Sequence, residues 1–349
     1  NDWEIPFEVT VSICILLIWL YTNRGGIKTI VWTDTLQTGF MLLSVLLTVY
    51  FIANALPSVA NEGIIEQVAN GPYGKIFFFD DIYDANHFLK HFFGGIFIAI
   101  GMTGLDQDMM QKNLSCKSLK DAQKNMMSMA SVLIVVNLVF LFLGALLYMY
   151  AAAHSIPFEK SDMLFSAIAM DSNTPIIIGV LFLLGLIAAA YSSADSALTS
   201  LTTSIFVDLV PEKSKTEDNK VPLRKRIHVA VSILIILVVL ILHHYTDDSA
   251  IGLLMKFAGF TYGPLIGVFF FGILTKRIIS DRAIPLMSII SISITFVLWY
   301  FSKGAPGVEK GAQGNLGDYS FGFEIIILNA FLTFTLLFIA SKAHSSLKR

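Results

Sequence analysis

A helical stripe of oxygen-bearing side chains stands out in this chain of 349 residues. Ser192, Asp195, Ser196 and Thr199 follow the spacing i, i+3, i+4 and i+7, which places them on one face of a helix. Hydroxyl and carboxylate oxygens are hard ligands that suit an alkali cation. Residues 176–190 precede the stripe without a charge, and a carboxylate on such an apolar helix costs about 2.5–3.5 kcal/mol in a membrane. The pattern indicates a cation site around Asp195, whereas the serines alone favour close helix packing in lipid.

Asp34 is a second acidic residue beside an apolar segment. It lies about 9 Å beyond Lys28 if the turn at residues 25–37 continues as a helix, which places it at or below the membrane surface. A helix-end acid and a functional carboxylate both fit this position.

Two further stretches contain residues that interrupt helices. Four glycines fall within residues 94–104, and such a stretch is typical of a discontinuous transporter helix that lines a cavity. The pair Asp106 and Asp108 follows it and indicates a helix end or a gating network. Residues 256–267 contain Gly and Pro inside an apolar run, and Lys256 suits either snorkelling to the interface or contact with a substrate.

The composition that must position these groups is that of an integral membrane protein. Hydrophobic residues make up 55% of the chain and charged residues 14%. About nine segments are long and apolar enough to span a bilayer, and we predict an all-α polytopic membrane protein. The predicted spans lie at residues 5–22, 30–53, 88–111, 126–153, 175–208, 223–243, 251–275, 283–301 and 322–341.

Positive charge predicts the orientation. Eighteen of the 24 Lys and Arg residues fall in alternate loops, which the positive-inside rule places in the cytoplasm. The N-terminus of this chain is therefore predicted outside and the C-terminus in the cytoplasm. The near-neutral net charge of −2 gives no indication of nucleic acid as a partner.

Negative findings narrow the class of protein. Cys14 lies in a predicted span and Cys116 in a loop, so no disulfide is expected. Nucleotide-binding loops, His-Glu-x-x-His motifs and Cys/His clusters are missing from the sequence, and nothing in it indicates an enzyme. The chain starts at Asn1, and an odd number of spans with an outside N-terminus predicts that it is a fragment.

Four motifs together resemble the sodium:solute symporters, a family that includes bacterial sodium-coupled sugar, sialic acid, proline and pantothenate carriers. They span almost all of the chain. The motifs are Gly25-Gly26 with Val31-Trp32-Thr33-Asp34-Thr35-Leu36-Gln37, then Asp106-Gln107-Asp108-Met109-Met110-Gln111-Lys112, then Ala189-Ala190-Tyr191-Ser192-Ser193 with Leu198-Thr199-Ser200, and Gly263-Pro264 through Lys276.

The resemblance implies a LeuT-like fold of two inverted five-helix repeats in a single transmembrane domain at 1–349. Residues 1–53 are then the last two helices of the first repeat, 88–275 the second repeat, and 283–341 two additional helices. The first core helices are not in this chain. Sodium-coupled symport of a small organic solute across the plasma or inner membrane, by alternating access, is the implied activity.

The resemblance also implies two sodium sites. Half of the first is present, at Ala189, Ser192 and Ser193. The second joins two core helices through Asp34, Ser192, Asp195 and Ser196. Relatives carry a hydroxyl where this chain has Asp195, so either a cation or a proton neutralises the added carboxylate. We favour an occupied cation site.

The solute is less sharply implied. Sugar-carrying relatives have Asn and Tyr where this chain has Ala99 and Met102, and their polar residue on the tenth core helix corresponds to about Lys256. With Thr103, these residues form the predicted substrate cavity. A cationic Lys256 suits an anionic solute, although a sugar, sugar acid, amino acid or carboxylate all remain open.

Three alternatives to sodium symport remain. A proton-coupled carrier differs in its coupling ion, and a cation channel predicts currents that are uncoupled from solute. A sensor module of the same fold predicts a long hydrophilic C-terminal extension, whereas residues 342–349 form a short basic tail.

Overall fold

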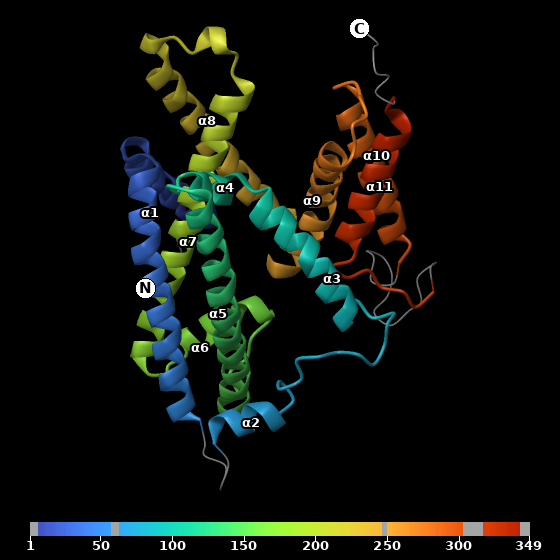
Figure 1. The fold of residues 1–349 in the computed structure, drawn as a ribbon. Helices are drawn as coiled ribbons and strands as arrows, with labels where there is room; N and C mark the ends of the chain where they lie inside the picture. Colours follow the sequence, from blue (N-terminus) through green and yellow to red (C-terminus); the bar gives the residue numbers. More distant parts are fainter. Residues whose placement is uncertain (1–5, 57–62, 246–249, 303–316, 343–349) are drawn as a thin grey trace, which may run out of the picture. The chain divides into compact units, whose positions relative to one another are not determined.

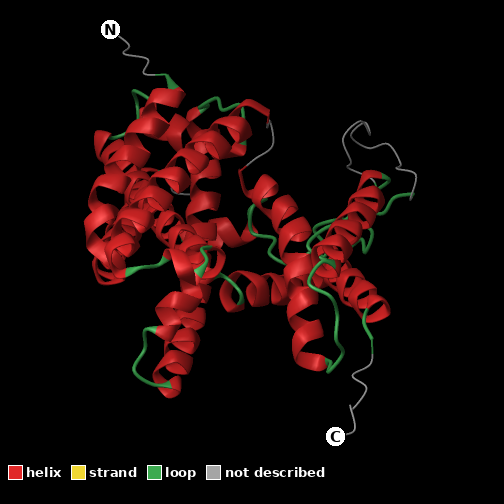
Figure 2. Ribbon diagram, turned by 90° about the horizontal axis from the view of Figure 1, so that it is seen from above, coloured by secondary structure: helices red, strands yellow, loops and turns green. Residues whose placement is uncertain are grey.

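The computed structural model describes residues 6–56, 63–245, 250–302 and 317–342, apart from the side chains at 21, 23–31, 217, 245, 250–253, 255 and 256. These residues are largely helical, and the one β-type pairing among them is an isolated antiparallel bridge between Ile278 and Lys342. Figure 2 accordingly draws helices and loops without a strand in this part of the chain. The predicted all-α fold is confirmed.

Membrane-spanning helices are numerous, as predicted. Within the described residues, six helices are long and apolar enough to cross a bilayer: Trp32–Ala55, Leu119–His154, Ile176–Leu209, Asp218–His244, Phe257–Leu274 and Ala283–Tyr300. A bent pair, Phe88–Gly104 and Gln107–Leu114, gives a seventh if it counts as one span. The predicted spans 5–22 and 322–341 coincide with the shorter apolar helices Phe7–Leu20 and Ile325–Ala340. Within the described residues, six or seven of the nine predicted spans thus reach full length, because 16 helical residues extend only about 24 Å.

The chain divides into two compact units, which we describe separately. The first unit comprises residues 1–74 and 111–249, and the second comprises 75–110 and 250–349. The first contains α1 (Phe7–Ala55), α2 (Ile64–Asn70), α5 (Leu119–His154), α6 (Leu164–Met170), α7 (Ile176–Ser204) and α8 (Glu217–Tyr245). The second contains α3 (Phe88–Ala99), the π-helical turn η1 (Ile100–Gly104), α9 (Ala250–Leu274), α10 (Ala283–Tyr300) and α11 (Ile325–Ala340). Helix α4 (Gln107–Leu114) crosses the boundary in sequence.

Helix α1 reverses direction although its 49 residues are continuously helical. Its first part runs parallel to α7, because Thr22 and Thr202 both bond to His228 while Ile15 and Ile18 share a cluster with Leu198. Its second part runs antiparallel to α7.

The contacts of that second part fix its direction. Ser192 bonds to Asp34, and the Ser44 hydroxyl donates to the carbonyl of Leu181. The chain must therefore turn back between Thr22 and Asp34, as the two predicted spans 5–22 and 30–53 require. Figure 1 shows the second part of α1 beside α7 and α5.

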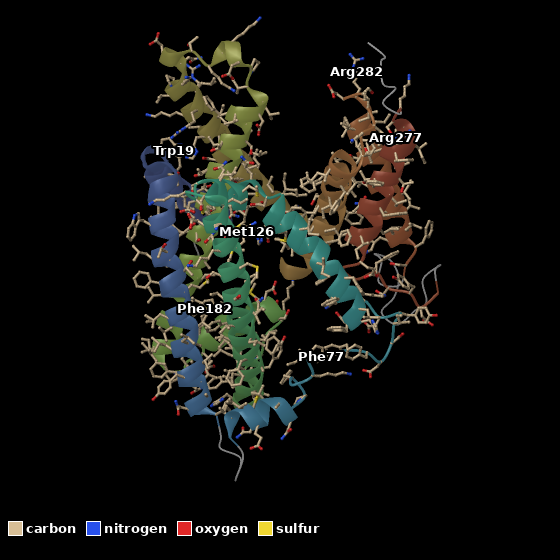
Figure 3. The ribbon with its side chains drawn as sticks, viewed as in Figure 1. Trp19, Phe77, Met126, Phe182, Arg277 and Arg282 are labelled. Carbon is tan, nitrogen blue, oxygen red and sulfur yellow. The ribbon has the colours of Figure 1, made fainter. Side chains whose placement is uncertain are left out.

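The core of the first unit is apolar and lies toward the C-terminal end of α1. Ile52, Leu146, Ile168 and Ile178 are fully buried there, each from a different helix. Phe182 stacks at a tilt on Phe165, with 4.7 Å between ring centroids (Figure 3). This packing fixes α7 against α1 and so sets the level at which Asp34 meets the Ser/Asp stripe.

A row of glycines on α9 brings α11 into close contact in the second unit. Gly259, Gly263 and Gly267 lie four residues apart and face α11. A Cβ at Gly263 would lie 2.6 Å from the Cβ of Asn329, a distance that real side chains do not reach. Small residues at such spacing are the usual means of close helix approach in lipid.

Asn329 forms a polar clamp between three helices. Its side chain is fully buried, and its Nδ2 donates to the carbonyls of Gly259 (3.2 Å) and Phe260 (3.1 Å). Pro264 has no N–H for the carbonyl of Phe260, four residues earlier, so Asn329 supplies the missing donor. Ser291 on α10 in turn donates to Asn329 Oδ1 at 2.6 Å.

A buried lysine ties the segment before α11 to the start of α3. The Nζ atom of Lys90 donates to the carbonyl of Ser320 (2.7 Å) and lies 3.9 Å from the ring centroid of Tyr319. Tyr319 donates to Glu324, and burial together with this bond raises the pKa of its hydroxyl above the usual range. At the far end of α9, Arg277 donates to Ser341 (Figure 3).

Candidate functional site

Asp34 and the Ser/Asp stripe come together in the first unit, as the second predicted cation site requires. Ser192 Oγ donates to Asp34 Oδ1 at 2.8 Å, which links α7 to the second part of α1. The side chain of Asp34 is 18% exposed, so the carboxylate is largely removed from solvent and lipid. The pairing joins residues 158 positions apart in the chain.

The rest of the stripe is buried on the same face of α7. Asp195 has no exposed surface and Ser196 retains 9%. Thr199 Oγ1 is buried and has no hydrogen-bond partner in the described part of the chain. Buried oxygens of this kind are usually completed by water or an ion, so the donor set fits a hard cation such as sodium.

Lys112 is the residue that sequence reasoning missed. Its Nζ lies 2.9 Å from Asp34 Oδ2 and 3.2 Å from Ser196 Oγ, so a fixed ammonium contacts two of the predicted sodium ligands. The positive-inside count includes Lys112 among the basic residues of a cytoplasmic loop. The signal in the sequence was the position of Lys112 at the end of motif 106–112, beside the end of a predicted span. A lysine at that position can reach acidic residues within the membrane, which need a counter-charge.

The half of the first sodium site that this chain contains lies on α7 as predicted. Ala189 is partly buried, and Ser193 is exposed. Ser192 is committed to Asp34 in this structure. Its membership of the first site therefore stays a prediction.

Three of the four predicted substrate residues lie at a break in a helix of the second unit. Ala99 ends α3, and Met102 and Thr103 lie in the π-helical turn η1 (Ile100–Gly104) that follows. Turns of this type are frequent at functional sites. Lys256 belongs to α9, but its side chain lies outside the described residues.

Local contacts explain how the break is held. The Oδ1 of Asp106 accepts from the backbone N–H groups of Asp108 (3.0 Å) and Met109 (3.2 Å), and thereby caps α4 at a bend of 58°. A Cβ at Gly101 would lie 2.9 Å from the Tyr262 ring, so the turn packs directly on α9. Tyr262 is a second residue that the sequence did not single out at this break.

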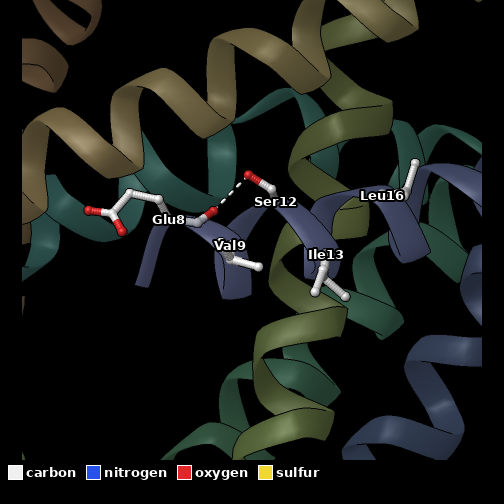
Figure 4. Close-up of a pocket in the computed structure, with 5 residues that line it drawn as sticks. All are labelled: Glu8, Val9, Ser12, Ile13 and Leu16. Carbon is white, nitrogen blue, oxygen red and sulfur yellow. Dashed lines mark hydrogen bonds between the residues drawn. The ribbon is translucent and has the colours of Figure 1, made fainter. Parts of the chain in front are cut away.

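Other site types are not supported in the described part of the chain. It contains no group of three His, Cys, Asp or Glu side chains able to hold a metal. Figure 4 shows a depression on the first part of α1, lined by Glu8, Val9, Ser12, Ile13 and Leu16. Its lining is almost entirely apolar and includes none of the predicted site residues.

Comparison with known proteins identifies the family of the chain. The model of the sodium:solute symporter family matches residues 3–289. The chain is 22% identical to a sodium/sialic acid symporter of Aliivibrio fischeri, over 84% of this chain and 58% of the relative. It is 23% identical to a sodium/glucose cotransporter of Vibrio parahaemolyticus, over 88% of this chain and 60% of the relative.

A human relative is named for a different class of solute. Sodium-coupled monocarboxylate transporter 1 is 25% identical over 73% of this chain and 42% of its own length. The chain thus spans three fifths or less of these curated relatives. Since the family model covers well over half of the chain, the protein belongs to the sodium:solute symporter family.

Proposed function

We propose that this chain is part of a sodium-coupled symporter that moves a small organic solute across the cytoplasmic membrane by alternating access. The observation that carries the proposal is the buried pairing of Asp34 with Ser192, beside the fully buried Asp195. Two apolar helices bear these groups, and intramembrane carboxylates mark ion pathways. We assign the second sodium site to Asp34, Ser192, Asp195 and Ser196.

Coupling follows from charge. A sodium ion at the buried carboxylates lowers the free energy of the state that binds it, and linkage then raises solute affinity in that state. Each sodium that enters adds about 2.3 kcal/mol of driving force per 100 mV of membrane potential.

A small organic anion is the solute that we favour. The names of two relatives specify sialic acid and monocarboxylates, both of which carry a carboxylate. Lys256 on α9 supplies a positive charge in the helix that packs on the broken segment. The glucose cotransporter keeps a neutral sugar as the competing candidate.

Uptake into proteoliposomes containing the full-length protein tests the coupling. Labelled sialic acid, a short monocarboxylate and glucose are each supplied with a sodium gradient, a proton gradient or neither. We expect accumulation of at least one solute only with the sodium gradient, together with a solute-induced inward current. Accumulation driven equally by the proton gradient, or current without solute, would favour the proton-coupled or channel alternative.

Replacement of Lys256 tests the solute class. We expect Lys256→Ala to raise the KM for an anionic solute about tenfold, because the positive charge is lost, while the exposed Lys276→Ala control leaves it unchanged. Uptake of a neutral hexose that is insensitive to Lys256→Ala contradicts the anion assignment.

A further inference from the structure

Lys112 places a fixed positive charge where a second sodium is expected. Its Nζ is within hydrogen-bond distance of Asp34 Oδ2 (2.9 Å) and Ser196 Oγ (3.2 Å). These atoms belong to two of the four side chains assigned to the site. An ammonium in this position takes up the lone pairs that a metal ion needs, and it also neutralises Asp34.

Burial makes the contact more than a surface ion pair. The side chains of Lys112 and Asp34 are 29% and 18% exposed, whereas fully exposed ion pairs contribute little because water and salt screen them. Asp195, with no exposed surface, lies one residue before Ser196 on the same helix. If the ammonium moves away, Asp34 and Asp195 therefore lose its compensating positive charge.

The lysine is carried by a different element from its partners. Lys112 lies on the short helix α4, just after the 58° bend, while Asp34 and Ser196 lie on α1 and α7. A lysine ammonium on its four-carbon stem can move by rotation of the side chain. The bond of 2.8 Å between Ser192 and Asp34 does not involve Lys112, so the carboxylate stays in place when the ammonium leaves.

We infer that Lys112 is a built-in competitor for sodium: its ammonium and a sodium ion exclude each other at Asp34 and Ser196. The inference rests on the proposed function. In this structure the ammonium contacts Asp34 and Ser196, two of the proposed sodium ligands. Sodium binding then requires its departure, so the affinity for the second ion is set by Lys112 as well as by the carboxylates.

Equilibrium binding of radioactive sodium to the purified full-length protein, without solute, tests the competition. We expect Lys112→Met to lower the half-saturating sodium concentration of the weaker site at least tenfold, since the competing charge is removed. Lys117→Met is the matched control, because Lys117 is an exposed cation in the following loop. The control should bind sodium as the native protein does.

A chemical rescue guards against misfolding of Lys112→Met. Lys112→Cys is prepared with Cys14, Cys116 and any cysteine outside this chain replaced by serine. After folding, aminoethyl methanethiosulfonate restores a cation at position 112, and methyl methanethiosulfonate adds a neutral group. We expect only the charged reagent to weaken sodium binding to the native level.

The outcomes separate the inference from the function on which it rests. Unchanged or weaker sodium binding in Lys112→Met, with the two reagents acting alike, overturns the competition and leaves sodium symport intact. Failure of native protein and both variants to bind sodium, together with sodium-independent uptake, overturns the proposed function as well.

Discussion

At the scale of single residues, the charge of Asp195 is the feature that most constrains the site. Its side chain is completely buried on α7, and the structure places Asp34 and Lys112 around the neighbouring Ser192 and Ser196. Two charged groups thus contact these serines, and Asp195 lies on the same face of α7. Their balance decides how many cations the cluster holds.

Asp195→Asn isolates the contribution of this carboxylate. We expect the half-saturating sodium concentration for uptake to rise at least tenfold and the Hill coefficient to fall, because a full negative charge is removed from the site. Asp208→Asn serves as the control, since Asp208 is exposed just beyond the C-terminal end of α7. Unchanged sodium affinity and Hill coefficient in Asp195→Asn contradict the assignment of the second site.

The sequence predicted the members of this cluster unevenly. The spacing on α7 is local, so helical periodicity alone placed Ser192, Asp195 and Ser196 on one face. Asp34 joined them only through the family resemblance, because no local pattern relates residues 158 positions apart. Lys112 was missed for the same reason, since its role depends on where α4 lies against α1 and α7.

At the scale of elements, helix breaks are recognisable in the sequence but their partners are not. Gly and Pro in residues 256–267 predicted an interrupted helix. The group that satisfies the break is Asn329, which lies on α11 and bonds to the carbonyl of Phe260 at 3.1 Å. Hydrogen-bond donors for a broken helix come from tertiary neighbours, so sequence alone does not identify them.

The loss of stability caused by removing the Asn329 side chain should be partly reversed when the missing backbone N–H of α9 is restored. We expect Asn329→Ala to lower the thermal stability of the purified protein, since a buried carbonyl loses its donor at a cost of about 1–3 kcal/mol. Pro264→Ala restores an N–H for Phe260, so the double variant should be more stable than Asn329→Ala alone.

The control for the clamp is on the same helix. Thr335 on α11 is partly exposed, and among the described residues its hydroxyl donates to the carbonyl of Phe331. Thr335→Ala should leave the melting temperature nearly unchanged, with or without Pro264→Ala. Additive effects of Asn329→Ala and Pro264→Ala are the result that contradicts the clamp.

At the scale of the whole molecule, the sequence predicts the fold class and the membrane orientation from two different properties. Long apolar runs predicted the membrane class correctly, because every backbone group in lipid must be paired within helices. The orientation depends on the distribution of Lys and Arg in loops, which is a property of insertion rather than of packing. It therefore remains a prediction.

Two single cysteines test the orientation. Glu66 on α2 and Lys117 before α5 are both exposed, and charge places them outside and inside the cell respectively. In a background without Cys14 and Cys116, a membrane-impermeant thiol reagent should label Glu66→Cys on intact cells. It should label Lys117→Cys only after permeabilisation, and the reverse pattern contradicts the predicted orientation.

The glycine row on α9 also limits how the protein can diverge. At Gly263 an added methyl group would lie 2.6 Å from Asn329, whereas Leu265 and Phe269 on the same helix are exposed. The face of α9 that packs on α11 therefore has no room for alanine in place of Gly263. The exposed face has room for most apolar side chains. Mutational tolerance along this helix should alternate with a period of four, so that sequence drift in α9 is confined to its exposed side.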